Sequence, residues 1–339
     1  MNQEYKNIIS NIEEVFHEFS ISKHLAVAIS GGCDSMALLL ALKNYCTPRN
    51  IKISALTIDH KMRANSSYEA TKLNDLLIKQ NIIHHIITIP SNLIPKSNIE
   101  AKLREIRYQL LSEFCNKNHI NFLFVGHHLG DVAENFLIRL MRGSGLDGLS
   151  PIKKLSILNN VKIIRPFLEI TKDELKNYLR DQKIQWFEDE TNNDEKFLRN
   201  KIRKFLTSFE DKNIIEKRIY SASKEIEKAR DFFDEIMCDI ESLVIKQIEP
   251  NLYLINRLEL RKINSTVGYK ILALLLMKIS QKKYKPRREK LVRFYEYLLQ
   301  DEELKKREFY GCVVEESKNS IKNSEAKIYL KNPHQKLFK

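Results

Sequence analysis

The sequence predicts an α/β fold, in which a Rossmann-like parallel sheet is followed by a mainly helical second domain. A continuous apolar run at 25–29, typical of a strand buried on both faces, is followed by further strand-like runs at 51–58, 82–89, 121–125 and 161–164, which alternate with helical patterns. After residue 200 the pattern is helical over 214–246 and 267–280, with one short strand-like run between them at 252–255. We therefore expect an α/β domain over 1–205, a helical domain over 206–300 and a small C-terminal segment over 301–339, which could belong to a further domain.

The first apolar run leads into the loop Ser30-Gly31-Gly32-Cys33-Asp34-Ser35, and a strong helix-forming segment follows at 36–42. Adjacent glycines reach backbone conformations closed to other residues, so successive N–H groups can converge on an anion at the positive end of the next helix. The Walker pattern G-x-x-x-x-G-K-[ST] occurs nowhere in the chain. The loop therefore predicts a phosphate site of another kind, whereas the alternative is an ordinary Gly-Gly turn between a strand and a helix.

Composition narrows the class of protein. The 339 residues carry 57 Lys and Arg against 44 Asp and Glu, a net charge of +13, which favours a polyanionic partner. Abundant Ile, Asn and Lys are typical of an AT-rich genome and explain part of the excess. The five cysteines are scattered and form no C-x-x-C pair, so neither a disulfide framework nor a zinc or iron–sulfur site is indicated. No signal-peptide core or membrane-length apolar run occurs, so we expect a cytoplasmic protein without a membrane partner.

Carboxylates follow two other predicted strands. Asp59 and His60 end the second strand, and Asp131 and Glu134 stand one turn apart near the start of the helix after the fourth. Ligands of open parallel sheets bind beyond the carboxyl ends of the strands, so these residues are site candidates. The alternatives are a solvated turn for Asp59 and His60, and a charge that complements the helix dipole for Asp131. Magnesium held by carboxylates and phosphate oxygens is the metal that would suit such a site.

Basic residues form further candidates. Arg104 lies on a helix where a salt-bridge ladder is the commoner explanation, and Arg142 opens the glycine-rich loop 142–149, which is either flexible or a substrate loop with a basic anchor. Arg199 and Arg203 belong to a basic helix that is either solvated or in contact with an RNA backbone. The densest basic cluster, interleaved with tyrosines, is an RNA-surface candidate and includes Lys282, Lys283, Arg287 and Arg288.

Eight segments, in this order, resemble the tRNA(Ile)-lysidine synthetases, a branch of the N-type ATP pyrophosphatases with a PP-loop. They are S-G-G-C-D-S (30–35), D-H-K-M-R (59–63), A-K-L-R-E-I-R-Y (101–108), G-H-H-L-G-D-V-A-E-N (126–135), R-G-S-G-L-D-G-L (142–149), R-P-F-L (165–168), W-F-E-D-E-T-N-N (186–193) and R-N-K-I-R (199–203). The resemblance covers about residues 20–205. Asn135 stands where the family usually has Thr, and Thr191 where it usually has Ser. Long members carry a further C-terminal domain, of which the chain up to Lys339 has room for only a part.

The resemblance implies a ligase. ATP would adenylate the C2 oxygen of the wobble cytidine in an isoleucine tRNA with a CAU anticodon, and free L-lysine would then displace AMP, which changes codon reading from AUG to AUA. Domain 1–205 would be catalytic and 206–300 would bind tRNA. A homodimer is left open.

The resemblance also implies roles for the candidate residues. Asp34, Asp131 and Glu134 would be catalytic, Asp34 and Asp131 would hold Mg²⁺, and Asp131 with Glu134 could attract the lysine cation. The remaining members fall into two sets. ATP would be bound by Ser30, Gly31, Gly32, Cys33, Asp34, Ser35, Asp59, His60 and Arg104. RNA would be bound by Arg142, Arg199, Arg203, Lys282, Lys283, Arg287 and Arg288.

Three alternatives stay open. A tRNA thiolase of the same superfamily would need catalytic cysteines, typically spaced C-x-x-C, and an amidotransferase-fed synthetase would need a glutaminase; neither is found here. A non-enzymatic RNA-binding protein would not require the phosphate loop.

Overall fold

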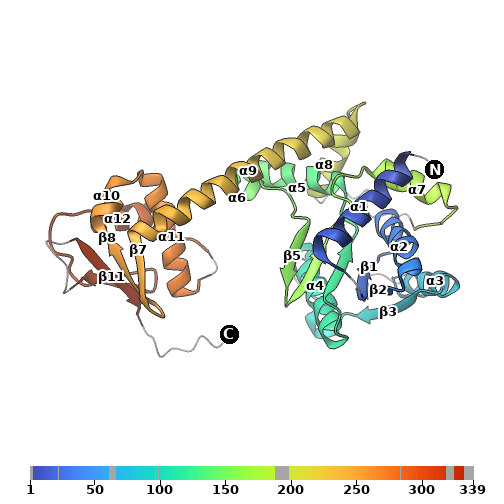
Figure 1. Cartoon of the computed structure of the whole chain (residues 1–339), viewed down its shortest axis with the longest axis horizontal. Coiled ribbons are helices and arrows are strands. Elements are labelled where there is room, and N and C mark those ends of the chain that lie inside the picture. The colour runs from blue at the N-terminus through green and yellow to red at the C-terminus, as the bar shows by residue number, and fades with distance from the viewer. Residues whose placement is uncertain are drawn as a thin grey trace. The chain divides into compact units, whose positions relative to one another are not determined.

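The computed structural model describes residues 3–21, 23–60, 66–95, 97, 99–187, 198–282, 284–317 and 324–331. The chain forms two compact units, residues 1–227 and 228–339 (Figure 1). The sequence-based division at 205 and 300 remains a prediction about the extent of the domains. Within the described residues, no helix is long and apolar enough to cross a membrane.

A six-stranded sheet forms the centre of the first unit. Its order is β3-β2-β1-β4-β6-β5, with strands β1 His24–Ala28, β2 Lys52–Asp59, β3 Ile83–Thr88, β4 Phe122–Val125, β5 Leu155–Leu158 and β6 Val161–Ile164. The first four strands and β6 are parallel, as the apolar runs predicted. The sequence patterns missed β5, which pairs antiparallel with β6 at the sheet edge.

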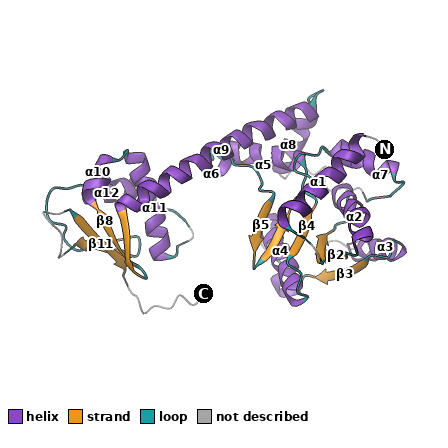
Figure 2. Ribbon diagram, in the orientation of Figure 1, coloured by secondary structure: helices purple, strands orange, loops and turns teal. Residues whose placement is uncertain are grey.

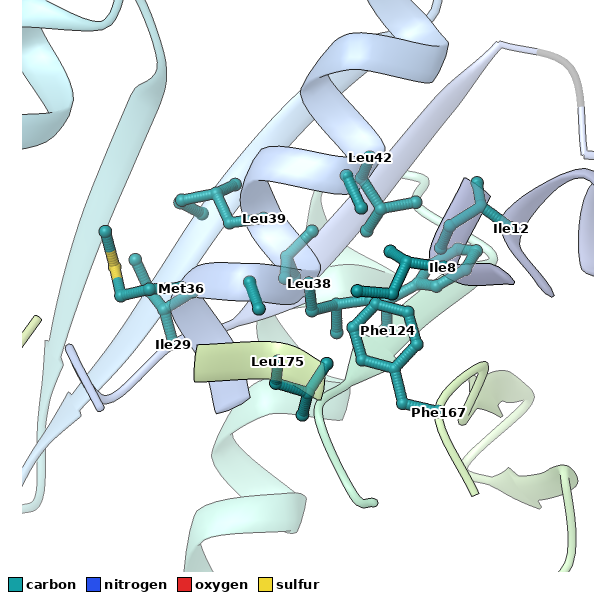
Figure 3. Packing of buried hydrophobic residues seen from close by; sticks show 14 of the residues in the cluster. Ile8, Ile12, Ile29, Met36, Leu38, Leu39, Leu42, Phe124, Phe167 and Leu175 are labelled. Carbon is teal, nitrogen blue, oxygen red and sulfur yellow. The ribbon is translucent and has the colours of Figure 1, made fainter. Parts of the chain in front are cut away.

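Helices cover both faces of this sheet (Figure 2). They are α1 Gln3–Phe19, α2 Cys33–Cys46, α3 Ser66–Lys79, α4 Ile99–Lys117 and α7 Lys172–Asp181, with short 3₁₀ turns at Thr47–Arg49 and Ser91–Leu93. Successive strand residues point to opposite faces. Accordingly Leu25 and Val27 join the core under α1, α2, α3 and α7, whereas Ala26 and Ala28 pack with Leu111 of α4. Figure 3 shows the first of these cores.

The strand order predicts that a ligand binds between the ends of β1 and β4. From β1 the chain proceeds outward to β2 and β3 and then returns to β4 on the other side of β1, so β1 and β4 flank a switch point. Ligands of open α/β sheets bind at such points, beyond the carboxyl ends of the strands. Gly126, directly after β4, lies so close to the loop after β1 that a Cβ would stand 2.8 Å from the Asp34 carbonyl oxygen. The two strand ends therefore contact each other closely.

Two further helices lie side by side in this unit, α5 Leu129–Met141 and α8 Leu198–Thr207, and share a small core of Ala133, Ile202 and Leu206 (Figure 1). The short α6, Leu146–Leu149, follows α5. The division between the two units falls within the 33-residue helix α9, Lys212–Val244.

The second unit combines helices with a five-stranded antiparallel sheet of order β7-β8-β11-β10-β9. Its elements are β7 Ile245–Glu249, β8 Leu252–Asn256, α10 Arg257–Lys262, α11 Ser265–Ser280, α12 Arg288–Leu298, β9 Arg307–Phe309, β10 Cys312–Glu316 and β11 Glu325–Leu330. Arg257 is fully buried in this unit and donates to the Leu298 carbonyl at 2.8 Å and to Glu316 at 3.0 Å. The predicted helices are confirmed, and the region contains more strand than the patterns indicated.

Candidate active site

The loop after β1 is a tight turn held by its own serines. Gly31 has φ +81°, which favours glycine, and Gly32 is extended and caps α2. Ser35 Oγ donates to the Gly32 carbonyl at 3.0 Å and accepts from the Ser30 N–H at 3.2 Å. These bonds fix the loop at the positive end of α2, where an anion is favoured.

A second segment packs onto this loop. The Phe187 N–H donates to the Gly31 carbonyl at 2.9 Å, and a Cβ on residue 31 would lie 2.5 Å from Phe187 Cδ2. Glycine is therefore required at position 31 both by its dihedral angle and by the ring against it.

His128 brings the two predicted magnesium ligands together. Its Nδ1 accepts from the Gly130 N–H at 3.0 Å, so Nε2 is the ring nitrogen that carries a proton. That Nε2 lies 3.7 Å from Asp34 Oδ2 and 3.8 Å from Asp131 Oδ2. Asp131 also closes a capping box by accepting from the His128 N–H at 3.0 Å. Asp131 thus caps α5 and also lies with Asp34 and His128 beyond the carboxyl ends of β1 and β4.

Two arginines of α8 form ion pairs with Asp131 and Glu134. Arg199 donates from Nη2 to Asp131 Oδ1 at 2.5 Å and from Nε to Glu134 Oε2 at 2.7 Å. Arg203 Nε donates to Glu134 Oε1 at 2.7 Å. Glu134 is only 4% exposed, so charge-assisted bonds of this kind are strong. The two arginines predicted to contact RNA therefore face carboxylates of α5, and their predicted RNA role gains no support from this geometry.

The environment keeps Asp131 ionised. Burial alone would raise the pKa of this carboxyl, but His128, Arg199 and the backbone N–H of His128 outweigh burial and hold the pKa well below its ordinary range. The side chain is therefore a permanent negative charge at neutral pH.

Two arginines contact His127. Arg104 Nη2 lies 3.2 Å from His127 Nε2, and Arg165 Nε donates to His127 Nδ1 at 3.1 Å. Burial chiefly, with Arg104, Arg165 and Arg107 adding to it and Asp131 opposing, lowers the pKa of His127 to about 3. The ring is neutral, and the arginines supply positive charge suited to a polyanion. The sequence pattern assigns no role to Arg165, which lies in the R-P-F-L segment.

Lys172 is a second residue that sequence reasoning missed. It is the first residue of α7, whose capping box is formed by Thr171 and Glu174, and its Nζ lies 4.0 Å from Asp34 Oδ2. The backbone explains this placement, because the Leu129 N–H donates to the Ile170 carbonyl at 2.9 Å and so joins the two segments.

Cys33 behaves as a packing residue. Burial, with a contribution from Asp34, raises the pKa of its thiol to about 12. A protonated buried thiol is a poor nucleophile, which agrees with a filler role at the variable position of the loop.

Asp59 is buried at the end of β2, with His60 next to it. The end of β2 abuts the phosphate loop, since Thr57 Oγ1 donates to the Ile29 carbonyl at 3.2 Å. Their contact with ATP stays a prediction. Residues 61–63 of the D-H-K-M-R segment and residues 188–197 lie outside the described residues.

The remaining basic candidates lie at the surface. Arg142 is exposed at the end of α5, whereas Arg287 and Arg288 are exposed at the start of α12. Lys282 Nζ lies over the Tyr310 ring at 4.3 Å. Lys283 lies outside the described residues. RNA binding by this cluster stays a prediction.

Known proteins resemble the chain in sequence and in fold. Residues 4–209 match the PP-loop domain family. The chain is 34% identical over 319 residues to the tRNA(Ile)-lysidine synthase of Orientia tsutsugamushi (strain Boryong), covering 92% of this chain and 71% of that protein. Synthases of the same name from Wolbachia pipientis wMel and Rickettsia typhi (strain ATCC VR-144 / Wilmington) are 30% and 31% identical, over 86% and 94% of this chain and 68% and 73% of theirs.

A solved structure shares the fold. It is the U34-tRNA thiolase NcsA from Methanococcus maripaludis with its 4Fe-4S cluster, at a TM-score of 0.55 and 18% identity, covering 66% of this chain and 79% of that one. At this identity the likeness concerns the fold alone. Taken with the matching PP-loop domain and the sequence relatives, the chain belongs to the tRNA(Ile)-lysidine synthase family of PP-loop enzymes.

Proposed function

We propose that this chain uses ATP to join free L-lysine to C2 of the wobble cytidine in an isoleucine tRNA with a CAU anticodon, releasing AMP and diphosphate. One observation carries the proposal beyond family membership. The phosphate loop and Asp131 meet at the sheet's switch point, where Asp34 and Asp131 approach the same nitrogen of His128 at 3.7 and 3.8 Å. This arrangement supports a nucleotide phosphate site at the loop, beside the ionised Asp131 and several arginines.

The first step would be adenylation. The C2 carbonyl oxygen attacks the α-phosphorus of ATP, the bond from that phosphorus to the bridging oxygen breaks, and diphosphate leaves. A ring carbonyl oxygen is a poor leaving group, whereas the same oxygen in a phosphate ester leaves as AMP. The N–H groups of the loop at 30–35 would bind the diphosphate portion at the start of α2. Lys172 Nζ, 4.0 Å from Asp34 Oδ2, would add a positive charge there.

Magnesium fits the acidic part of the site. Asp34 Oδ1 is buried and accepts no hydrogen bond from the described residues, and the ionised Asp131 supplies a second hard oxygen ligand. Mg²⁺, when bound by Asp34 and Asp131, would neutralise phosphate charge as diphosphate departs.

The second step would be attack of the lysine ε-amine on C2, with release of AMP. The amine is protonated at neutral pH and must lose a proton first. Asp131 offers a charge that could hold the ammonium group. Both oxygens of Glu134 already accept from Arg199 and Arg203, so Glu134 would meet the amine only by exchanging one of these contacts.

The test is AMP formation by the purified chain with ATP, lysine and the unmodified tRNA. AMP release should require both lysine and the tRNA, and Asp34→Asn should lower it by on the order of 100-fold while leaving tRNA retention intact, because the isosteric change removes only the charge at the phosphates. Asp75→Asn, on the exposed face of α3, is the matched control. AMP release that proceeds without lysine, or that survives Asp34→Asn, would contradict the proposal.

A further inference from the structure

Helix α8 has two chemically different faces. The inner face packs Ile202 and Leu206 against α5, and its Arg199 and Arg203 bind Asp131 and Glu134. The arginines that made this helix an RNA candidate are therefore turned toward the active site.

The outer face of α8 carries Lys201, Lys204, Phe205 and, in the turn that follows, Phe209. All four are exposed, Phe205 at 55% and Phe209 at 39%. The two rings contact each other edge to face, with centroids 5.1 Å apart. Residues 201, 204 and 205 share a face because they are three and four positions apart. The outer face thus combines a fixed aromatic pair with neighbouring cations.

This combination fits single-stranded RNA better than it fits a protein. Two exposed phenyl rings are costly in water. Helix α8 itself contains no acidic residue, and Glu210 and Asp211 follow only after Phe209. Exposed aromatic rings next to lysines are the elements of surfaces on which unpaired bases stack while the backbone meets positive charge. A purely apolar protein partner would offer no negative charge to the lysines. Paired RNA would not present free base faces to the rings.

The face also lies near the chemistry. Phe205 is six residues beyond Arg199 on one helix, a rise of about 9 Å, and Arg199 donates to Asp131 at 2.5 Å. Bases adjoining the one that reacts could therefore reach the rings.

We propose that Lys201, Lys204, Phe205 and Phe209 form a stacking surface for unpaired nucleotides of the RNA substrate, next to the reacting base. The inference rests on the proposed function, since it needs an RNA substrate with an exposed loop. It reassigns RNA contact from the inner arginines of α8 to its outer face.

The experiment measures binding of the full chain to an anticodon stem-loop with a CAU anticodon and to a blunt RNA duplex of the same length. Phe205→Ala/Phe209→Ala should weaken stem-loop binding by about 10-fold or more, because two bases lose their stacking partners, and leave duplex binding unchanged. Lys201→Ala/Lys204→Ala should weaken binding of both the stem-loop and the duplex. It should also reduce the slope of log affinity against log salt by the amount expected for about two lost phosphate contacts. Controls are Phe232→Ala on α9, 65% exposed, and Lys79→Ala/Lys117→Ala on α3 and α4.

Phe205→Leu/Phe209→Leu keeps an apolar surface without rings and separates stacking from folding. It should bind as weakly as the alanine pair; restored binding, or unchanged affinity in the alanine pair, would overturn the stacking surface. AMP formation by the wild type is measured in parallel. Stem-loop binding that depends on the rings without lysine-dependent AMP would refute the proposed ligase alone, whereas lysine-dependent AMP with ring-independent binding would refute the surface alone.

Discussion

At the scale of single residues, Glu134 is the side chain whose surroundings differ most from its expected role. The sequence predicts a carboxylate that meets the lysine amine. In the structure the side chain is buried and accepts from Arg203 Nε and Arg199 Nε, each at 2.7 Å. Its negative charge therefore holds two arginines in place, one of which also binds Asp131. Its role in lysine transfer stays a prediction.

Glu134→Gln tests the two roles. If Glu134 acts by holding Arg199 and Arg203, the change should lower adenylation and lysine transfer by a similar factor and decrease the free energy of unfolding by about 3 kcal/mol, because a buried ion pair loses one partner. Formation of adenylated tRNA and its turnover by lysine are measured in separate single-turnover assays, with Glu105→Gln on the exposed face of α4 as control. Accumulation of adenylated tRNA would instead assign Glu134 to the amine.

At the scale of elements, the loop between β1 and α2 depends on the backbone conformation of Gly31 and on its contact with an aromatic ring. Gly31 has φ +81° and faces the Phe187 ring, while Gly143 has φ +70° with no atom within 4 Å of an added Cβ. Both glycines have a positive φ, but only Gly31 has a side chain packed where a Cβ would be. They form a matched pair.

Gly143→Ala should decrease the free energy of unfolding by about 1 kcal/mol, the cost of a left-handed backbone for alanine. Gly31→Ala should cost about 1–3 kcal/mol more, because the methyl group must displace the ring or the loop. It should also weaken ATP binding, which Gly143→Ala leaves intact. Urea unfolding and ATP titration of both variants check this; equal effects on stability would show that Phe187 moves aside freely.

At the scale of the whole molecule, stability depends on buried polar groups in each unit. In the second unit Arg257 is fully buried against Leu298 and Glu316. In the first unit His84 bridges Asn74 of α3 at 3.0 Å and Thr57 of β2 at 2.8 Å, and Thr57 donates to the Ile29 carbonyl below the phosphate loop. Burial first, and His85 second, lower the pKa of His84 to about 4.

This shift makes the first unit sensitive to acid. The ordinary histidine pKa of 6.5 applies to the unfolded chain, so between 6.5 and about 4 the unfolded state binds the extra proton. Stability from His84 is complete above pH 6.5, falls as the pH drops and levels off below pH 4. From pH 7.5 to pH 5 the loss should be at most about 2 kcal/mol.

Urea unfolding at both pH values checks the loss, with His84→Gln as the control that keeps polar contacts but does not titrate. The difference between wild type and His84→Gln should shrink as the pH falls. A difference that is the same at both pH values would show that His84 does not carry the acid sensitivity.

The sequence by itself determined the parallel strands, the phosphate loop and the meeting of Asp34 with Asp131. Apolar runs and glycine turns are visible locally in the sequence. Because the carboxyl ends of parallel strands lie at the same end of a sheet, residues that follow different strands come together there. Strand β5 and the sheet of the second unit were less visible, because short, half-exposed strands are settled by their pairing partners. Only the tertiary structure decided that Arg199 and Arg203 face Asp131 and Glu134, that Arg165 contacts His127 and that Lys172 lies near Asp34. A basic helix has the same sequence pattern whether its cations face solvent, RNA or buried carboxylates. Arg199 and Arg203 turn toward α5 because the buried carboxylates there must be neutralised, and these carboxylates are distant in sequence.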